Sequence, residues 1–581
     1  MTGAEVATVL AEIAMLSEVL GENPFRARAF AAAARALEGS GADLDRLARE
    51  DALTTLPGVG EGIASTIREL VLDGRSGLYD RLREQMPVGL YEVMRVPGLG
   101  PKRAHTLHTA LGVDSLDALE AAARAGKVAA LPGFGAKTEA KVLEGIAFAR
   151  SLRGRRRYPA ALEVAVRLLE WLRANDHVSA AEIAGDVRRR MEIAESVDLV
   201  AASDHPAAVL AGFRSLSGVA ESEIEARDRA CIVFSDGLSA HLHVVPPKQF
   251  VAAVVVATGS GKHVSALQAL AEEKGFTLDA TGLRKSRRVV ELADEEALYG
   301  ALGLAYVPPE LREDWGEVEA AAAGRIPRLV EMDDLRGTFH CHTTYSDGKA
   351  TVAEMAEAAR ERGWQYLGLG DHSKSAGYAG GLSPAAVRKQ HREIDAWNCA
   401  NGGKGEDRFR IFKGIESDIL SDGSLDYDDD VLASFDYVVG SVHSAFGLPE
   451  RKMTDRIIRA VRNPHITILG HATGRLLLSR GSYAVDVRAV IDAAAEHGVA
   501  VEINADPVRL DLDWRHVRYA GEKGVLVPID PDAHSTRALG NVAFGVNVAR
   551  KGWLTAPQVL NTWTLEEVEE HFGKRKQQGA P

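Results

Sequence analysis

The stretch Thr338-Phe339-His340-Cys341-His342, followed by Asp347, sets the pattern for the C-terminal part of the chain. Its alternation is typical of a β-strand and places the imidazoles of His340 and His342 on one face. Short apolar runs recur at 366–369, 411–415, 437–439, 466–469, 499–503 and 525–529, with helical stretches between them. Strand-then-helix repeated about seven times predicts a (β/α)7 barrel over residues 336–575.

Histidines and acidic residues gather at or just after the ends of these predicted strands. A single such residue has an ordinary explanation as a surface or helix-capping side chain. In a barrel, however, the carboxyl ends of all strands meet at one mouth. The residues in question are His340, His342, Asp347, His372, Glu416, His443, His471, Asp532 and His534. Mixed imidazole and carboxylate ligands predict a site for Mn²⁺, Zn²⁺ or Fe²⁺, without a choice among the three.

The composition limits the broad class of protein. The 581 residues carry a net charge of −13 and are 46% hydrophobic and 26% charged. At about 150 residues per domain, this length predicts roughly four folded units. No apolar run approaches the roughly 20 residues of a membrane span, so we expect a cytoplasmic protein that does not contact a membrane. Three cysteines cannot form a disulfide framework, which agrees with a reducing compartment.

One short pattern, Pro-Gly-x-Gly after an apolar residue, occurs three times in the first 150 residues. Each copy precedes a helical stretch, whose free N–H groups provide a phosphate-binding geometry. One copy alone would indicate a plain turn, but three copies favour phosphate binding. The repeated pattern resembles the helix-hairpin-helix motif, which binds the nucleic-acid backbone without reading bases. The predicted DNA contacts are Gly58, Gly60, Gly98, Gly100, Lys102, Arg103, Gly133, Gly135 and Lys137. Net acidity therefore hides local basic patches, such as the arginines at 150–157 and 188–190.

The middle of the chain mixes helical and strand patterns. Strand-like runs occur at Ser196–Val200, Ala230–Phe234, Leu242–Val245 and Ala253–Val256. The stretch from Ala184 to Glu192, with Gly185 and Arg188, precedes Ser196-Val197-Asp198. Three further stretches are Asn23-Pro24-Phe25-Arg26, Thr258-Gly259-Ser260 and Pro308–Glu313. Together with the repeated turns, all these residues resemble a bacterial family X DNA polymerase with a C-terminal PHP domain.

The resemblance implies a multidomain α+β protein. It implies an all-α N-terminal domain (1–90) with a helix-hairpin-helix, and fingers (91–155) with two more. A nucleotidyltransferase-like α/β palm (156–250), a thumb (251–315), a linker (316–335) and the PHP barrel (336–575) would follow. The protein would act as a monomer on gapped or broken DNA.

The same resemblance implies up to three metals in the barrel. One would be held by His340, His342, Glu416 and Asp532, a second by Glu416, His443 and His471, and a third by Asp347, His372 and His534. The catalytic residues would be His340, His342, Glu416, His443 and Asp532 in the barrel and Asp198 in the palm, with Arg475 and Arg509 as phosphate contacts. The implied activity is a 3′–5′ exonuclease or phosphodiesterase on DNA.

The palm departs from the family pattern. Family members hold two Mg²⁺ or Mn²⁺ ions with three aspartates, two of them in an Asp-x-Asp. Here Ser196 replaces the first aspartate, His241 stands at the third, and Asp198 alone is present. A hydroxyl and an imidazole suit Mg²⁺ poorly. We therefore expect weak or absent synthesis, and nucleotide binding through Gly185 and Arg188 only if the palm is active.

Three alternatives remain at this stage. The first is an active gap-filling polymerase with an associated exonuclease. The second is a small-molecule PHP phosphatase, which would have no use for three helix-hairpin turns. The third is an inactive scaffold at DNA ends, against which the complete set of predicted metal ligands argues.

Overall fold

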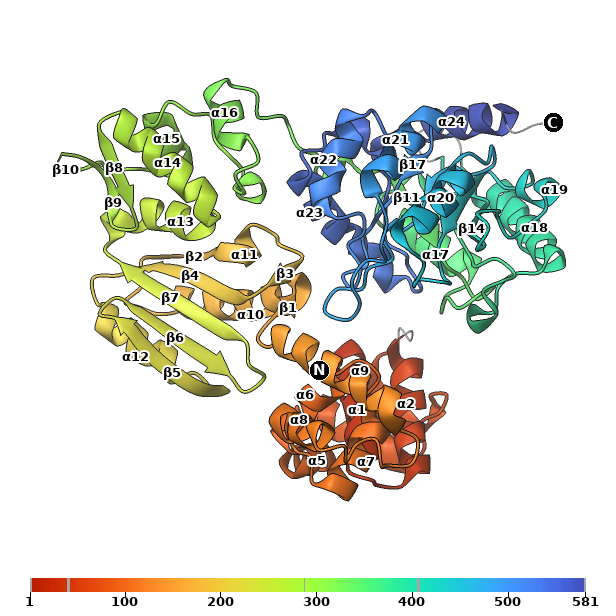
Figure 1. The fold of residues 1–581 in the computed structure, drawn as a ribbon, viewed down its shortest axis with the longest axis horizontal. Coiled ribbons are helices and arrows are strands. Elements are labelled where there is room, and N and C mark those ends of the chain that lie inside the picture. Colours follow the sequence, from red (N-terminus) through yellow and green to blue (C-terminus); the bar gives the residue numbers. More distant parts are fainter. Residues whose placement is uncertain (1–2, 39–41, 287, 404, 406–407, 579–581) are drawn as a thin grey trace. The chain divides into compact units, whose positions relative to one another are not determined.

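The computed structural model describes residues 3–38, 42–286, 288–403, 405 and 408–578 (Figure 1). The chain divides into two compact units, Met1–Arg153 and Gly154–Pro581. The regular elements among the described residues of the first unit are all helices, whereas the second unit contains mixed helices and sheets.

The first unit is built from short helices joined by tight turns. They are α1 (Gly3–Val19), α2 (Pro24–Glu38), α3 (Leu44–Arg49), α4 (Glu61–Asp73), α5 (Gly77–Gln85), α6 (Val88–Met94), α7 (Pro101–Leu111), α8 (Leu116–Arg124) and α9 (Gly135–Ser151). Helix α4 shows why they pack, since Ile63, Ile67 and Leu70 repeat at helical spacing and are buried. The first glycine of each repeated turn has a left-handed backbone, with φ of 75°, 85° and 82° at Gly58, Gly98 and Gly133. Glycine takes up this conformation without steric cost.

The second unit begins with a five-stranded sheet. Its strands are β2 (Ala180–Ala184), β4 (Ser196–Ala202), β5 (Val219–Ala226), β6 (Arg229–Phe234) and β7 (Ser239–Val245), in the order β2-β4-β7-β6-β5. β4 and β7 are parallel and every other neighbouring pair is antiparallel. Helices α10 (Tyr158–Arg173) and α12 (Pro206–Arg214) pack against the sheet. The short helix α11 (Gly185–Arg188) follows β2 directly.

A smaller helical and stranded region follows this sheet. It contains α13 (Phe250–Thr258), α14 (Gly261–Glu273), β8 (Phe276–Asp279), β9 (Gly282–Lys285), β10 (Arg288–Val289), α15 (Glu295–Ala301) and α16 (Glu317–Ala322). The strand expected at Ala253–Val256 is wrong, because these residues lie inside helix α13. The helix is apolar on almost all sides, so its sequence carries no amphipathic period that would distinguish it from a buried strand.

The C-terminal region forms the predicted barrel. Its parallel strands are β11 (Gly337–Cys341), β12 (Tyr366–Leu369), β13 (Arg410–Phe412), β14 (Gly414–Asp418), β15 (Tyr437–Ser441), β16 (Ile468–Leu469), β17 (Ala500–Val501), β18 (Ile503–Asn504) and β19 (Ile529–Asp530). Bridges from His372 to Glu416 and from Cys341 to Ala533 link the separate sheets. The runs expected as single strands at 411–415 and 499–503 are each split into two short strands.

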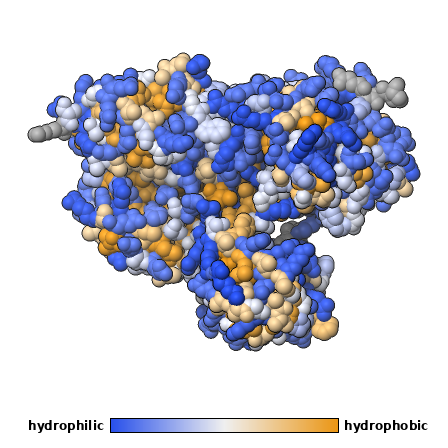
Figure 2. All heavy atoms as spheres, viewed as in Figure 1, coloured by the Kyte–Doolittle hydropathy of each residue, from blue (hydrophilic) through white to orange (hydrophobic). Residues whose placement is uncertain are grey.

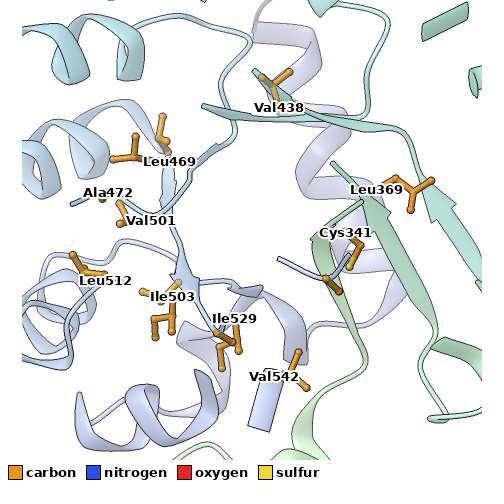
Figure 3. Close-up of a cluster of buried hydrophobic side chains, with 14 of the residues drawn as sticks. Cys341, Leu369, Val438, Leu469, Ala472, Val501, Ile503, Leu512, Ile529 and Val542 are labelled. Atoms are coloured by element: carbon orange, nitrogen blue, oxygen red, sulfur yellow. The ribbon is translucent and has the colours of Figure 1, made fainter. Parts of the chain in front are cut away.

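Helices surround this barrel and one end of it is filled by aromatic side chains. The helices are α17 (Val352–Arg360), α18 (Pro384–Asn401), α19 (Asp429–Leu432), α20 (Glu450–Val461), α21 (Val487–His497), α22 (Trp514–Glu522), α23 (Val542–Lys551) and α24 (Leu565–Gln578). Cys341, Leu369 and Val438 belong to the buried cluster drawn in Figure 3. Phe339, Tyr437 and Phe572 of α24 form a second buried cluster. Apolar packing thus fixes the strands, so that polar side chains at their carboxyl ends are held in place.

The face of the molecule drawn in Figure 2 is mainly polar. Hydrophilic side chains predominate on the face drawn in Figure 2, with hydrophobic ones in smaller groups. Among the described residues, there is no helix with the length and apolar character to cross a membrane.

Candidate metal centre and nucleic-acid contacts

The carboxylate of Glu416 lies at the centre of the candidate metal site. Glu416 is on β14 and is only 1% exposed. Four imidazoles approach its two oxygens, from four different strand ends. His372 Nδ1 lies at 2.8 Å, His471 Nε2 at 2.9 Å, His443 Nε2 at 3.2 Å and His340 Nε2 at 3.3 Å. The convergence predicted from the strand pattern therefore places these side chains around one carboxylate.

Two further carboxylates extend the cluster. Asp532 Oδ1, just after β19, lies 3.1 Å from His342 Nε2. Asp347 Oδ1 lies 3.2 Å from His534 Nε2, and its Oδ2 lies 3.7 Å from His372 Nε2. All nine predicted ligands thus meet at one mouth of the barrel.

The donor atoms form overlapping groups that suit metal ions. In each group the donors lie within 4.8 Å of one another. The groups are His340, His342 and Asp532; His372, Glu416 and His443; and His342, Asp347, His372 and His534. Both ring nitrogens of His342 and the Nε2 of His340 are buried and have no hydrogen-bond partner among the described residues. Buried imidazole nitrogens without partners, beside ionised carboxylates, fit a divalent metal such as Mn²⁺, Zn²⁺ or Fe²⁺.

The electrostatics keep the two buried carboxylates of the predicted ligand set, Glu416 and Asp532, ionised. Burial favours the neutral acid, but the imidazoles of His443 and His340 outweigh burial and hold the pKa of Glu416 well below its usual range. Burial is likewise outweighed at Asp532, where His340 and His342 hold the pKa well below its usual range. Because metal ligands must be deprotonated, both groups are in the state that binds a cation.

Backbone conformation is unusual at three of the ligands. His340, His471 and Asp532 have positive φ angles of 53°, 23° and 50°. Residues other than glycine adopt this region at a cost, and such positions concentrate at functional sites. The strand β11 accordingly shows a register shift between Thr338 and Cys341.

Two carboxylates that sequence reasoning missed support the imidazoles from behind. Asp418 Oδ1 lies 2.7 Å from His443 Nδ1. Glu502 Oε1 lies 3.1 Å from His340 Nδ1, and its Oε2 accepts the backbone N–H of His471 at 2.9 Å. A carboxylate on the far ring nitrogen fixes the orientation and tautomer of a metal-binding histidine.

Asp371 and Arg475 lie close to the cluster, but their side chains form hydrogen bonds to other protein groups. Asp371 accepts hydrogen bonds from Thr343, Ser346 and Gln390, and so ties down the loop that leads to Asp347. Arg475 is 8% exposed and donates to the backbone oxygens of Arg509 and Leu510 and to Asp513. The predicted phosphate contact at Arg475 is therefore committed to internal partners.

Arg509 and Tyr378 border the cluster. Arg509 Nε lies 3.5 Å from Asp532 Oδ2, and the side chain keeps 20% of its surface exposed. Tyr378 is 74% exposed, with ring centroids 6.0 Å from His372 and 6.5 Å from His443. Sequence reasoning missed Tyr378, which follows no strand directly and lies in a short turn.

The five-stranded sheet, predicted as the palm, brings together the residues expected at a polymerase site. Asp198 on β4 pairs in register with His241 on β7, and Ser196 Oγ donates to Asp198 Oδ2 at 2.9 Å. Gly185 has a φ of 59°, and an added Cβ there would lie 2.2 Å from Asp198 Oδ2. Arg188 donates to Glu295 and to Thr258. Burial raises the pKa of the Asp198 carboxyl.

The first unit presents its repeated turns at helix starts. Gly60 and Gly100 are the capping residues of α4 and α7, and Gly135 is the first residue of α9. Lys102, Arg103 and Lys137 are exposed. A groove of about 680 Å³ lies between the second turn and helix α9 and is lined by Gly98, Arg103 and Lys141, among others. Basic side chains beside free helix N–H groups fit a phosphate backbone.

Family models match most of the described regions. A helix-hairpin-helix domain matches residues 1–76, and a SAM-like helix-hairpin-helix tandem matches 91–147. A DNA polymerase beta thumb matches residues 253–313, and a PHP domain matches 338–506. The multidomain α+β fold class is confirmed. The fold and site thus define a DNA-binding, polymerase-like protein with an attached metal-binding PHP domain.

The chain belongs to the bacterial family X DNA polymerases that carry a PHP domain. It is 36% identical, over 97% of its length and 98% of the relative, to the "DNA polymerase/3'-5' exonuclease PolX" of Bacillus subtilis. The barrel region also resembles smaller proteins. A probable phosphatase of Thermoanaerobacter is 27% identical over 41% of this chain and 94% of its own. One of Caldicellulosiruptor saccharolyticus is 30% identical over 34% of this chain and 78% of its own.

Proposed function

We propose that the barrel cluster hydrolyses DNA from the 3′ end as a metal-dependent 3′–5′ exonuclease. The observation that carries this proposal is the convergence of nine candidate metal ligands, with Glu416 at their centre, in a chain that also has helix-hairpin-helix turns. The name of the Bacillus subtilis relative, which includes this activity, supports it. A small-molecule phosphatase would not need the DNA-binding unit.

The side chains divide the work of this reaction. Glu416 and Asp532, ionised and buried, and Asp347 would hold up to three Mn²⁺, Zn²⁺ or Fe²⁺ ions together with the histidines. When bound, such ions supply a water of lowered pKa and neutralise charge on the phosphate. Arg509 has an exposed edge beside Asp532 and would bind a phosphate oxygen. The aromatic ring of Tyr378 would stack on a base at the DNA end.

The test uses the full chain with Mn²⁺ on end-labelled gapped DNA. Variants His340→Ala and Asp532→Ala should lose nucleotide release, because each removes a ligand that the neighbouring carboxylates or imidazoles cannot replace. His497→Ala, at the end of α21, serves as a matched control for loss of a barrel histidine. Degradation that survives both ligand changes would contradict the proposal.

We further propose that the palm synthesises DNA weakly or not at all. Asp198 has Ser196 and His241 as neighbours where a two-metal site needs carboxylates, and Arg188 is engaged by Glu295. The alternative is an active gap-filling polymerase with the exonuclease attached, which the name of the relative favours. Primer extension on gapped DNA with Mg²⁺ at ordinary polymerase rates would support that alternative.

We also propose the domain limits that the sequence resemblance implies. The substrate would be gapped or broken DNA. The protein would bind it as a monomer in the cytoplasm. The second and third hairpin turns, with Lys102, Arg103 and Lys137, would bind the backbone, whereas the first has Glu61 in place of a cation. DNA affinity should therefore fall steeply with salt.

A further inference from the structure

A row of chemically distinctive side chains crosses the palm sheet, away from the barrel cluster. Asp198 on β4 pairs with His241 on β7, and His241 pairs with Cys231 on β6. Cys231 in turn pairs with Glu223 on β5. Residues paired directly across neighbouring strands project from the same face of the sheet. The row therefore places a thiol, an imidazole and carboxylates side by side.

The donor atoms in this row are close enough for one metal ion. Cys231 Sγ lies 3.9 Å from His241 Nε2, and His241 Nδ1 lies 3.1 Å from Glu225 Oε1. One donor atom from each of the three residues lies within 4.8 Å of the others. Tetrahedral zinc, with bonds of about 2.0–2.3 Å, sets its donors about 3.3–3.8 Å apart. The donors of this group, within 4.8 Å of one another, therefore lie close to that spacing.

The chemistry of the donors selects the kind of metal. A thiolate and an imidazole prefer Zn²⁺ and similar transition metals, and they suit Mg²⁺ poorly. Burial and the nearby carboxylates of Glu225 and Glu223 raise the pKa of the Cys231 thiol. A bound cation reverses this effect, because a coordinating thiol is deprotonated. The acidic surroundings therefore favour a cation at this position.

The site is also open to solvent and to a further ligand. His241 and Glu225 each keep 38% of their side-chain surface exposed. They line a cavity of about 350 Å³ together with Asp198 and Arg229. Zinc sites with three protein ligands keep a fourth position for water or a ligand. The cavity provides room for it.

We propose that Cys231, His241 and Glu225 bind one Zn²⁺ ion on the palm sheet, beside Asp198. The palm thereby holds a transition metal in the region where a polymerase site would need Mg²⁺. The proposal is independent of nuclease activity in the barrel, whose nine predicted ligands include no cysteine.

Cobalt titration of the full-length protein tests this site. Cobalt replaces zinc, and a Co²⁺–thiolate charge-transfer absorption arises only where a cysteine binds the metal. Because the barrel ligands are histidines and carboxylates, that absorption reports the palm alone. We expect its intensity at saturation to correspond to one thiolate-bound Co²⁺ per chain in the unchanged protein, and we expect it to vanish in Cys231→Ser. Zinc content, measured by mass spectrometry, should fall by one ion per chain in the same variant.

Controls make the test specific. Cys399→Ser removes an exposed cysteine on α18 and should leave the absorption unchanged. His241→Ala and Glu225→Gln change half-exposed side chains and should weaken cobalt affinity about tenfold or more. They keep the test valid if Cys231→Ser fails to fold. No thiolate absorption in the unchanged protein, its persistence in Cys231→Ser, or unchanged affinity in both His241→Ala and Glu225→Gln would overturn the proposal.

Discussion

Replacing Asp418 with asparagine isolates the contribution of a residue that supports a metal ligand without belonging to the ligand set. Asp418 is 8% exposed, and its Oδ1 lies 2.7 Å from His443 Nδ1, while His443 Nε2 faces Glu416. Asparagine preserves the shape but removes the charge. A hydrogen bond to a charged group contributes about 1.5–3 kcal/mol, against about 0.5–1.5 kcal/mol for a neutral one.

The difference of about 1–2 kcal/mol predicts a metal affinity lower by about tenfold or somewhat more. This agrees with the 10–100-fold losses that are typical when a carboxylate behind a metal-binding histidine is changed. The Mn²⁺ concentration for half-maximal nucleotide release should rise by that factor. The rate at saturating Mn²⁺ should recover most of its original value.

The assay is a Mn²⁺ titration of exonuclease activity at fixed DNA concentration. Asp422→Asn is the matched control. Asp422 lies four residues further along the chain, and its Oδ1 accepts hydrogen bonds from the backbone N–H and the hydroxyl of Ser424. That variant should titrate like the unchanged protein. If Asp418→Asn shows the same metal dependence as Asp422→Asn, the positioning role of Asp418 is refuted.

Three more predictions concern acid stability, DNA-end binding and the palm. Burial lowers the pKa of His391 and His571 to about 4, so the unfolded state binds more protons below pH 6.5. Each histidine should therefore cost up to roughly 3 kcal/mol of stability between pH 6.5 and 4, and urea unfolding of His391→Phe should show a shallower loss than the unchanged protein. Tyr378→Ala should slow nucleotide release from single-stranded 3′ ends about tenfold, because stacking on an aromatic ring contributes about 1–3 kcal/mol per base. Tyr378→Phe keeps the ring and should not slow release. Equal release rates for the two variants would contradict this role. Ser196→Asp combined with His241→Asp should restore Mg²⁺-dependent primer extension, and a double variant without extension would mean that further palm residues are missing.

The convergence of the nine candidate ligands was predictable from the sequence, because the barrel brings the ends of successive strands close together. His340 and Asp532 are far apart in the sequence. Their proximity followed from one rule, that the carboxyl ends of parallel strands meet at one mouth of a barrel. The supporting carboxylates are harder to detect. Asp418 lies two positions after Glu416 on one strand, and that spacing places both on the same face. Glu502 shows a weaker signal, a single acid between the apolar residues Val501 and Ile503.

Other features depend on contacts that no local pattern encodes. The helix over Ala253–Val256 was expected as a strand, since an apolar run without periodicity fits either structure. Arg475 was expected to face phosphate, but Asp513 and backbone oxygens near Leu510 bind its guanidinium. Whether such an arginine can bind phosphate depends on which hydrogen-bond partners the fold places beside it. The local sequence does not reveal those partners.

The most direct test of the central claim is the rate of 3′ nucleotide release by Glu416→Gln at saturating Mn²⁺. Glu416 contacts four imidazoles, so the substitution disrupts the whole cluster while nearly preserving side-chain volume. We expect the rate of nucleotide release to fall about a thousandfold or more. DNA affinity should be unchanged, because the hairpin turns lie in the other unit. Nucleotide release within about tenfold of the unchanged protein would contradict the assignment of hydrolysis to the barrel.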